Sequence, residues 1–313
     1  MKSNYIKKLQ TGDQLVNEQF AIKNVRYGRT QAGKDYIDLS LSDRTGEIDG
    51  KIWETNIQNC AEIQTGDVVE LSGKVEEFRD KQQINIGFLQ KAVNFDLSDL
   101  LPKSDKDQNA LWQTVQANVD QIENKYLKKL LLKFFGTEDF TEKFKVSPGA
   151  ERIHHAYLGG LMEHTAEMLD LANTLLNNYP ELDRDLLICG VLLHDCGKTQ
   201  ELAVNHAIYR TTEGSLIGHI SLGSFMVAKA IDSIKDFPVE LRAKVINMIL
   251  GHHEKLEFGS PIKPMTREAF ALAHIDNLSA KVNTANKVVK DLENTEQEFS
   301  DKNYALDTKL YLN

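Results

Sequence analysis

The sequence predicts a protein of two domains, a small closed β-barrel followed by an all-α domain. In residues 13–95 apolar and polar side chains alternate in short runs, with the period of a β-strand. From about residue 111 to residue 290 the apolar side chains recur at three- and four-residue steps, with the period of an α-helix. All nine histidines of the 313-residue chain lie between His154 and His274. They are therefore confined to the helical domain, and we expect the chemistry of the protein there.

The barrel prediction follows from five strand-like runs. The segment KDYIDLSL at 34–41 puts Ile37, Leu39 and Leu41 on one face, and a turn at 43–46 leads into EIDGKIWE. Another strand pattern covers 67–78, and a turn at 79–81 joins it to QQINIGF. A short helical stretch is expected near 55–62. No alternation of strands and helices typical of a parallel sheet is visible, so these runs favour a small closed barrel across residues 1–96.

The remaining segments differ in composition. Residues 97–110 are polar and contain Pro102, which indicates a linker. Residues 111–290 form the predicted helical domain, in which Leu161, Met168, Leu169 and Ala172 illustrate the helical spacing. Residues 291–313 are polar and acidic and are expected to form a C-terminal tail.

Composition excludes several classes of protein. The chain has 37 Lys+Arg against 46 Asp+Glu, and a net charge of −9 does not suit binding of nucleic acid or membrane through bulk positive charge. No apolar run reaches the roughly 18 residues of a membrane helix, and the N-terminus lacks the apolar run of a signal peptide. The three cysteines form no CxxC pair. We therefore expect free thiols, a cytoplasmic protein and no membrane partner, with any metal site built from His and carboxylates.

The strongest motif is the string VLLHDCGK at 191–198, in which His194 and Asp195 follow an apolar run. An HD pair alone is weak evidence, but other polar side chains lie in similarly apolar helical surroundings, where an unpaired charge would cost several kcal/mol. A metal ion removes that cost, because it neutralises carboxylates and takes up imidazole lone pairs. These further candidates are His164, His219, His252, His253 and Asp276.

This ordered set resembles the HD-domain superfamily of metal-dependent phosphohydrolases over about residues 150–285. The resemblance implies that His164, His194, Asp195 and Asp276 hold one divalent ion. It implies a second ion on His219 and His252, with Asp195 bridging the two. Mn²⁺ is the ion that the resemblance implies, with Fe²⁺, Co²⁺ and Mg²⁺ as alternatives. His154, His155, His206 and His274 receive no ligand role, and His206 and His274 are expected to pack or to support a ligand.

The first domain resembles the OB-fold of the anticodon-binding type. The string YIDLSLSDRTGEIDGKIWE at 36–54 carries this resemblance. An OB-fold followed by a linker and a helical HD domain is similar to the YhaM family of bacterial 3′-to-5′ exoribonucleases, over nearly the whole chain. The implied activity is stepwise hydrolysis of single-stranded RNA to nucleoside 5′-monophosphates, with single-stranded DNA as a second substrate class.

The chemistry of the residues agrees with that activity. Two ions bridged by Asp195 can lower the pKa of a bound water and stabilise charge on a phosphate. Lys198 is a candidate phosphate contact, since its ammonium is a compact positive charge. His253 is a candidate phosphate contact or proton donor to the leaving 3′ oxygen. We therefore expect Asp195, Lys198 and His253 to act in catalysis.

The barrel is expected to bind the strand through two loops and one sheet face. Residues 1–104 contain 14 basic and 16 acidic residues, so binding should be modest and depend on a few local contacts. A homo-oligomer would increase such weak binding through avidity. The candidate RNA-binding residues are Arg26, Arg29, Lys34, Tyr36, Phe78, Arg79 and Lys81.

Two other functions remain open from the residues alone. One is an HD phosphohydrolase or phosphodiesterase that acts on a small nucleotide, with a regulatory OB-fold. The other is a binding module that has lost activity. The complete ligand set counts against the second. The OB-fold counts against the first, because a small nucleotide needs no platform for a strand.

Overall fold

The computed structural model describes residues 2–79, 81–151, 155–204, 208–293, 295 and 297–312. His154 and His206 lie outside these described residues. The chain divides into two compact units, one of residues 1–103 with 204–208 and the other of residues 104–203 with 209–313. The first unit is a β-barrel and the second is helical, which confirms the predicted fold class.

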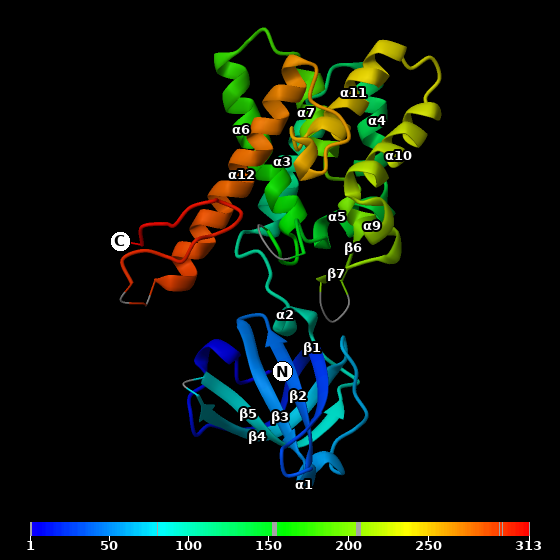
Figure 1. The fold of residues 1–313 in the computed structure, drawn as a ribbon. Helices are drawn as coiled ribbons and strands as arrows, with labels where there is room; N and C mark the ends of the chain where they lie inside the picture. Colours follow the sequence, from blue (N-terminus) through cyan, green and yellow to red (C-terminus); the bar gives the residue numbers. More distant parts are fainter. Residues whose placement is uncertain are drawn as a thin grey trace. The chain divides into compact units, whose positions relative to one another are not determined.

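The first unit is a closed five-stranded barrel (Figure 1). Neighbouring strands run in the order β1-β2-β3-β5-β4, antiparallel except for a parallel pairing of β3 with β5. Closure leaves no exposed sheet edge that could pair with another chain. The strands are β1 (Gln14–Arg29), β2 (Asp35–Asp43), β3 (Gly46–Trp53), β4 (Val68–Phe78) and β5 (Lys81–Lys91), with helix α1 (Glu54–Ile57) between β3 and β4.

Alternation along β2 and β3 separates the barrel core from an outer face. Ile37, Leu39 and Leu41 are buried inside, where they join Ile48 and Ile52 of β3. The residues between them point outward in register, so that Tyr36 pairs with Trp53 and Asp38 pairs with Lys51. The strand period thus builds one polar and aromatic face on the barrel.

The segment 97–110, predicted as a linker, contains structure of its own. Helix α2 (Leu97–Leu100) belongs to the barrel unit, and Leu100 is 1% exposed. Asp99 of this helix accepts a hydrogen bond from the Tyr5 hydroxyl. Helix α3 then begins at Gln108, capped by the side chain of Asp107. The polar composition of this segment reflects caps and ion pairs at the surface of folded elements.

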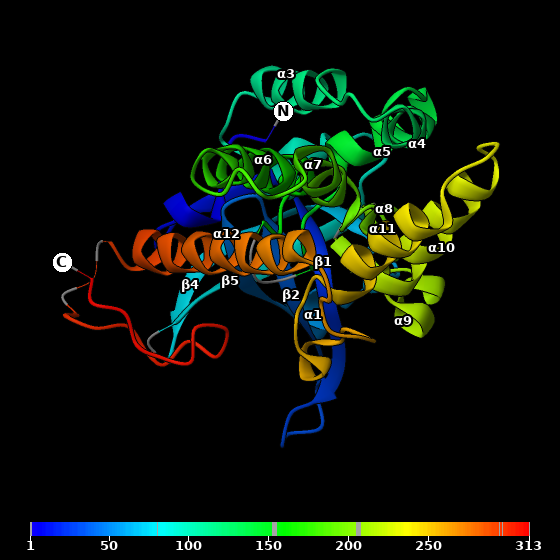
Figure 2. The ribbon, with the colours of Figure 1, turned by 90° about the horizontal axis from the view of Figure 1, so that it is seen from above.

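The second unit is a bundle of helices around one apolar core (Figure 2). Helix α7 is buried along most of its length, with α6 and α12 packed against it. A two-stranded sheet, β6 (Leu202–Val204) and β7 (Ile208–Arg210), follows α8. The helices are α3 (Gln108–Asp120), α4 (Lys125–Phe135), α5 (Glu138–Val146), α6 (Gly160–Asn178), α7 (Arg184–Leu193), α8 (Lys198–Glu201), α9 (Thr212–Ile217), α10 (His219–Asp232), α11 (Val239–Gly251) and α12 (Arg267–Leu292), with a short 3₁₀ turn at Leu256–Phe258 (η2). A further 3₁₀ turn, Ile6–Lys8 (η1), precedes β1 in the first unit.

The C-terminal segment after α12 folds back on itself. Bridges join Phe299 with Tyr311 and Asn303 with Thr308, and the Phe299 and Tyr311 rings lie 5.4 Å apart. Tyr304, at the turn, is 93% exposed. Among the described residues, no helix combines the length and the apolar character that crossing a membrane requires.

Candidate metal centre

The HD pair lies at the end of the most buried helix of the second unit. His194 is the C-cap of α7, and its Nδ1 lies 2.9 Å from the carbonyl oxygen of Val191. Asp195 follows directly, and both side chains are almost completely buried. Because α7 is surrounded by other helices, its C-terminal end can be reached by side chains from several of them.

One group of ligand atoms lies on one side of Asp195. It consists of His164 from α6, His194 and Asp276 from α12, whose ligand atoms lie within 4.8 Å of one another. The Nε2 atom of His164 is 3.2 Å from Oδ1 of Asp276. Oδ2 of Asp195 is 3.2 Å from His194 Nε2 and 4.0 Å from His164 Nε2. We call these three residues, His164, His194 and Asp276, the first group.

A second group faces the other oxygen of Asp195. His219 at the start of α10, His252 at the C-cap of α11 and the adjacent His253 also have ligand atoms within 4.8 Å of one another. Oδ1 of Asp195 is 3.5 Å from His219 Nε2 and 3.6 Å from His252 Nε2. Asp195 therefore presents Oδ2 to the first group and Oδ1 to this second group. The carboxylate thus lies between the two groups.

The buried atoms of the centre fit metal ions. Nε2 of His194, His219 and His252 and Oδ1 of Asp195 are buried and make no hydrogen bond within the described residues. Buried polar atoms without partners cost free energy, and cations bound by these atoms would remove that cost. Imidazole nitrogens with carboxylate oxygens are ligands for ions such as Mn²⁺, Fe²⁺ and Zn²⁺. The residues present thus fit divalent metal binding.

The pKa values of His164, His252 and Asp195 suit binding of a cation, whereas burial lowers the pKa of His194 but the adjacent Asp195 outweighs it and raises that pKa. Burial lowers the pKa of His164 to about 4, in spite of the nearby Asp276 carboxylate. Burial also lowers the pKa of His252. Burial raises the pKa of Asp195, but Lys198 and His194 outweigh it and hold the pKa well below its usual range. Neutral imidazoles and an ionised carboxylate are the forms that bind metals.

The predicted catalytic residues lie at this centre. Lys198 Nζ is 2.6 Å from Oδ2 of Asp195, and Lys198 is 6% exposed. The Lys198 ammonium is thus directed at the centre from one turn after Asp195. The second predicted group, His253, is half-buried, with its Nδ1 2.9 Å from the carbonyl oxygen of Phe258. Its place in the second group makes it a ligand candidate as well as a catalytic one.

A glycine allows α10 to approach the HD pair. A Cβ atom on Gly197 would lie 2.0 Å from the carbonyl oxygen of His219 and 2.5 Å from the nitrogen of Gly223. Any larger residue would therefore push the start of α10, and with it His219, away from Asp195. The neighbouring Cys196 is buried, and burial raises the pKa of its thiol. Cys196 is thus a protonated packing residue beside the centre.

The predicted RNA-binding residues of the barrel separate into two sites. Arg26 and Arg29 lie on β1 and Tyr36 lies on β2, and Arg29 pairs with Asp35 at 2.6 Å. Lys34, in the exposed turn between the two strands, is close to them in the chain. Phe78, Arg79 and Lys81 lie at the turn between β4 and β5, where Arg79 is 5.1 Å from the Phe78 ring centroid.

Comparison with known proteins decides the family. The HD domain family matches residues 161–281, and the OB-fold nucleic acid binding domain family matches residues 21–92. The 3'-5' exoribonuclease YhaM of Geobacillus sp. (strain WCH70) is 32% identical over 305 residues, which cover 96% of this chain and 92% of that protein. The 3'-5' exoribonuclease YhaM of Bacillus subtilis (strain 168) is 32% identical over 302 residues, which cover 94% of each. The chain belongs to the YhaM family.

The structure of this YhaM-family chain adds residues that sequence reasoning missed. On the barrel, Trp53 is 38% exposed beside Tyr36, with ring centroids 6.2 Å apart, and Lys51 Nζ lies 4.1 Å from the Tyr36 centroid. The alternation of β3 could have indicated Trp53, because it places Trp53 and Lys51 on the outer face.

Three further residues lie beside the candidate ligands. Ser279 contacts His164, Glu201 contacts His219, and Glu167 contacts Ser279. Helical spacing gives a partial indication, since Ser279 lies three residues after Asp276 and Glu167 lies three residues after His164. His274, expected to pack or to support a ligand, is instead exposed on α12.

Proposed function

We propose that this chain is a metal-dependent 3′-to-5′ exoribonuclease that releases nucleoside 5′-monophosphates from single-stranded RNA. The observation that carries the proposal is the position of Asp195 between two groups of candidate ligand atoms, in a chain that is similar over 94–96% of its length to proteins named 3'-5' exoribonuclease. A nucleotide-hydrolysing centre and a strand-binding barrel in one chain together suit a polymeric substrate.

The residues of the centre would have different roles in metal binding and catalysis. His164, His194 and Asp276 would hold one ion, and His219 and His252 the other, with Asp195 shared. When bound, such ions would activate a water molecule and stabilise the charge on the scissile phosphate. Lys198 would place a positive charge on a phosphate oxygen. His253 would contact the phosphate or hold a proton for the leaving 3′ oxygen, unless it serves as a further ligand.

The nature of the ions is part of the proposal. Six candidate ligands offer imidazole nitrogens and two carboxylates, a mixture that suits Mn²⁺ or Fe²⁺ better than Ca²⁺. We propose two ions per chain and Mn²⁺ as the ion, with Fe²⁺, Co²⁺ and Mg²⁺ as alternatives. Metal analysis of the purified chain, together with activity after loading with each ion, distinguishes them.

The barrel would bind the strand by stacking and by a few charges. Tyr36 and Trp53 offer ring faces to bases, and Lys51 lies near both rings. Base stacking on aromatic rings tolerates any sequence, as an exonuclease requires. The charged contacts to phosphates would come from Arg26, Lys34, Arg79 and Lys81, since Arg29 is paired with Asp35. Phe78 would add a third ring at the turn between β4 and β5.

Two broader expectations complete the proposal. A cytoplasmic location is consistent with the cysteines, since Cys60, Cys189 and Cys196 are all free thiols. A homo-oligomer would let several weak barrels engage one strand. Light scattering of the full chain measures the oligomeric state directly.

The decisive experiment follows the length of the substrate. Full-length protein with Mn²⁺ is incubated with a 5′-labelled oligoribonucleotide, the matching oligodeoxyribonucleotide and a panel of small nucleotides. We expect a ladder of RNA products shortened by single nucleotides, because hydrolysis from the 3′ end leaves the labelled 5′ end intact. Consumption of small nucleotides with an intact RNA ladder would instead establish the small-nucleotide phosphohydrolase.

The matched pair of variants is Asp195→Asn and Asp291→Asn. Asp195→Asn should abolish turnover and weaken Mn²⁺ binding, because an amide provides one oxygen where the carboxylate provides two. Asp291 is exposed at the end of α12, so the same change there should leave both properties intact. Full activity in Asp195→Asn would rule out a bridging role for this residue.

A further inference from the structure

Two of the histidines of the centre, His164 and His219, contact side chains through Nδ1, whereas the other two contact backbone carbonyl groups. His194 and His252 are fixed by their own helices, with Nδ1 2.9 Å from the Val191 oxygen and 2.6 Å from the Ile249 oxygen. His164 Nδ1 lies instead 3.0 Å from the hydroxyl of Ser279. His219 Nδ1 lies 3.1 Å from a carboxylate oxygen of Glu201. The orientation of these two rings thus depends on residues far away in the sequence.

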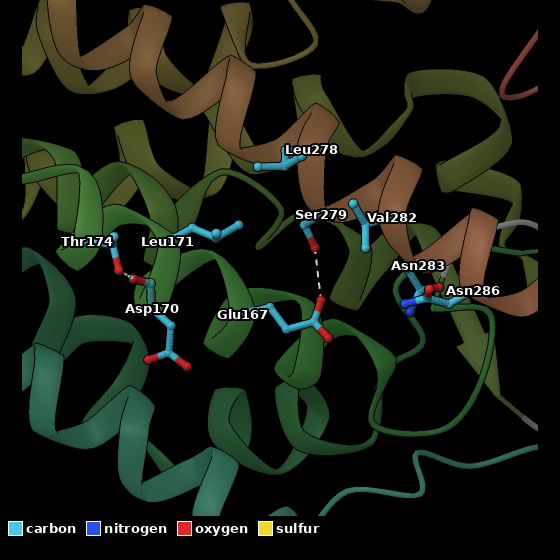
Figure 3. Close-up of a pocket in the computed structure, with 9 residues that line it drawn as sticks. All are labelled: Glu167, Asp170, Leu171, Thr174, Leu278, Ser279, Val282, Asn283 and Asn286. Atoms are coloured by element: carbon cyan, nitrogen blue, oxygen red, sulfur yellow. Dashed lines mark hydrogen bonds between the residues drawn. The ribbon is translucent and has the colours of Figure 1, made fainter.

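The contact to His164 continues to a glutamate. Ser279 donates a hydrogen bond of 3.0 Å to Oε2 of Glu167, across the space between α12 and α6 (Figure 3). A serine hydroxyl has one proton, and an ionised carboxylate can only accept. The Ser279 proton is therefore committed to Glu167, and the contact with His164 requires that Nδ1 of His164 donates. In this tautomer Nε2 of His164 carries the lone pair, which is the form in which a histidine binds a metal ion.

Glu167 is kept ionised by its other neighbours. Its Oε1 is 2.6 Å from Lys106 Nζ, and its Oε2 is 3.1 Å from His155 Nε2. Burial raises the pKa of Glu167, but the hydrogen bonds from His155 and Lys106 outweigh it and bring the pKa to about 2. The carboxylate also lines a groove of about 420 Å³ between α6 and α12, so it is only partly buried. A neutral amide can therefore replace it without a large loss of stability.

Glu201 contacts His219 directly, whereas Glu167 reaches His164 through Ser279. Oε2 of Glu201 faces His219 Nδ1, and its Oε1 lies 3.5 Å from Arg210. A carboxylate oxygen accepts hydrogen bonds, so this contact requires that Nδ1 of His219 donates, and the lone pair of the ring is then on Nε2.

We propose that Glu167, through Ser279, and Glu201, directly, are positioning residues that each orient one histidine of a different ligand group. This proposal rests on the proposed function, because it treats the two groups as the metal centre. Each glutamate then controls one ion, and the two ions can be altered separately. A glutamine at either place could donate through its amide, which would permit the wrong tautomer of the histidine. Loss of such a supporting partner costs about 10- to 100-fold in metal affinity.

Calorimetric titration of the metal-free, full-length chain with Mn²⁺ tests the proposal. We expect Glu167→Gln to weaken one binding step by about 10- to 100-fold. Asp276→Asn, which removes a ligand of the first group, should weaken that same step. Glu201→Gln should weaken the other step and leave the first unchanged. The proposal is overturned if both glutamine variants weaken the same step, or if neither weakens any.

The control is Glu163→Gln. Glu163 lies one turn before Glu167 on α6 and is 3.3 Å from the same Lys106 nitrogen, whereas the Ser279 hydroxyl donates to Glu167. Glu163→Gln should leave both binding steps unchanged. If it weakens Mn²⁺ binding as much as Glu167→Gln does, the effect of Glu167 comes from its charge alone and not from its contact with Ser279. Ser279→Ala should reproduce Glu167→Gln, since it breaks the same connection.

Two readouts separate this proposal from simpler explanations. The thermal midpoint of each metal-free variant reports general damage to the fold, which would weaken both steps together. The fate of labelled RNA reports the proposed function. A wild-type chain that binds two ions but leaves RNA intact overturns the proposed function alone. A wild-type chain that binds no Mn²⁺ overturns the metal centre and this proposal with it.

Discussion

The ammonium of Lys198 would compete with a metal ion for the Oδ2 atom of Asp195. Lys198 Nζ lies 2.6 Å from that oxygen, closer than any imidazole nitrogen of either group. A cation bound by the first group would have to share Oδ2 with this ammonium or displace it. Displacement would release the ammonium toward a phosphate, so the same side chain would neutralise Asp195 in the metal-free protein and contact substrate afterwards.

Replacing Lys198 should therefore separate metal binding from turnover. We expect Lys198→Met to keep or increase Mn²⁺ affinity, because a competing positive charge is removed. Turnover of RNA should fall by about 100-fold, the usual cost of losing one group that stabilises charge in the transition state. Calorimetry and the rate of RNA shortening give the two values. Weaker Mn²⁺ binding in this variant would contradict the assigned role.

The aromatic pair on the barrel gives a second prediction at this scale. Trp53→Ala should weaken RNA binding by about 1–3 kcal/mol, the value of one base stacked on an aromatic ring. Fluorescence anisotropy with a labelled oligoribonucleotide measures the change. Val93→Ala is the control, since Val93 is 88% exposed in the same unit and has no ring. An unchanged dissociation constant for Trp53→Ala would exclude stacking on this residue.

Single residues differ in how far the sequence predicts them. The order of His164, His194, Asp195, His219, His252 and Asp276 was sufficient to predict one centre, because apolar surroundings made each polar side chain conspicuous. Ser279 and Glu201 were not predictable in the same way. Their contacts with histidines depend on the packing of α12 against α6 and of α8 against α10, and a polar residue on a helix has no feature of its own that indicates such a partner.

At the scale of elements, the approach of α10 to the HD turn is the tightest requirement. Gly197→Ala would place a methyl group 2.0 Å from the His219 carbonyl oxygen. We expect a loss of about 1–3 kcal/mol in the free energy of unfolding from overpacking, with weaker binding of the ion that His219 holds. Denaturant unfolding and calorimetry measure these two effects.

Gly87→Ala is the control for replacing a glycine by alanine at a place without close contacts. A Cβ on Gly87 would lie 3.8 Å from the Ser72 oxygen, which is an ordinary contact. Its unfolding free energy should change by much less than that of Gly197→Ala. Equal effects of the two changes would mean that close approach of α10 does not explain the glycine in the HD motif.

The elements themselves were partly predictable. Alternation identified the barrel strands because each has one buried face, and helical spacing identified the bundle. The polar composition of segment 97–110 does not indicate its helices, because Asp107 within it and Asp96 just before it are helix caps. A capping aspartate and a solvated loop aspartate are the same in sequence. They differ only in whether the residues that follow are packed against an apolar surface, as the buried Leu100 is.

At the scale of the whole molecule, the two units can be observed separately. The chain has two tryptophans, Trp53 in the barrel unit and Trp112 in the helical unit. Trp112 packs at the edge of the helical core, near Phe135 and Lys145. Single-tryptophan variants, Trp53→Phe and Trp112→Phe, would thus each report the unfolding of one unit.

Mn²⁺ should stabilise one unit only. A free ion concentration of 100 times the dissociation constant adds about 2.7 kcal/mol to the stability of the state that binds it. We expect the Trp112 transition to rise by about 5–10 °C. The Trp53 transition should stay where it is in metal-free protein. Equal shifts of both transitions would show that the two units unfold together.

The centre also draws its ligands from widely separated places in the chain. His164 and Asp276 are 112 residues apart in the sequence, and the ligands between them come from the ends of α7, α10 and α11. Bound ions would therefore hold several long loops closed, and because the unfolded chain lacks the assembled site, their binding free energy would add to the stability of the folded state. A protease attacks a chain when it opens. The supply of metal would then set how long the protein survives in the cell, as well as whether it works.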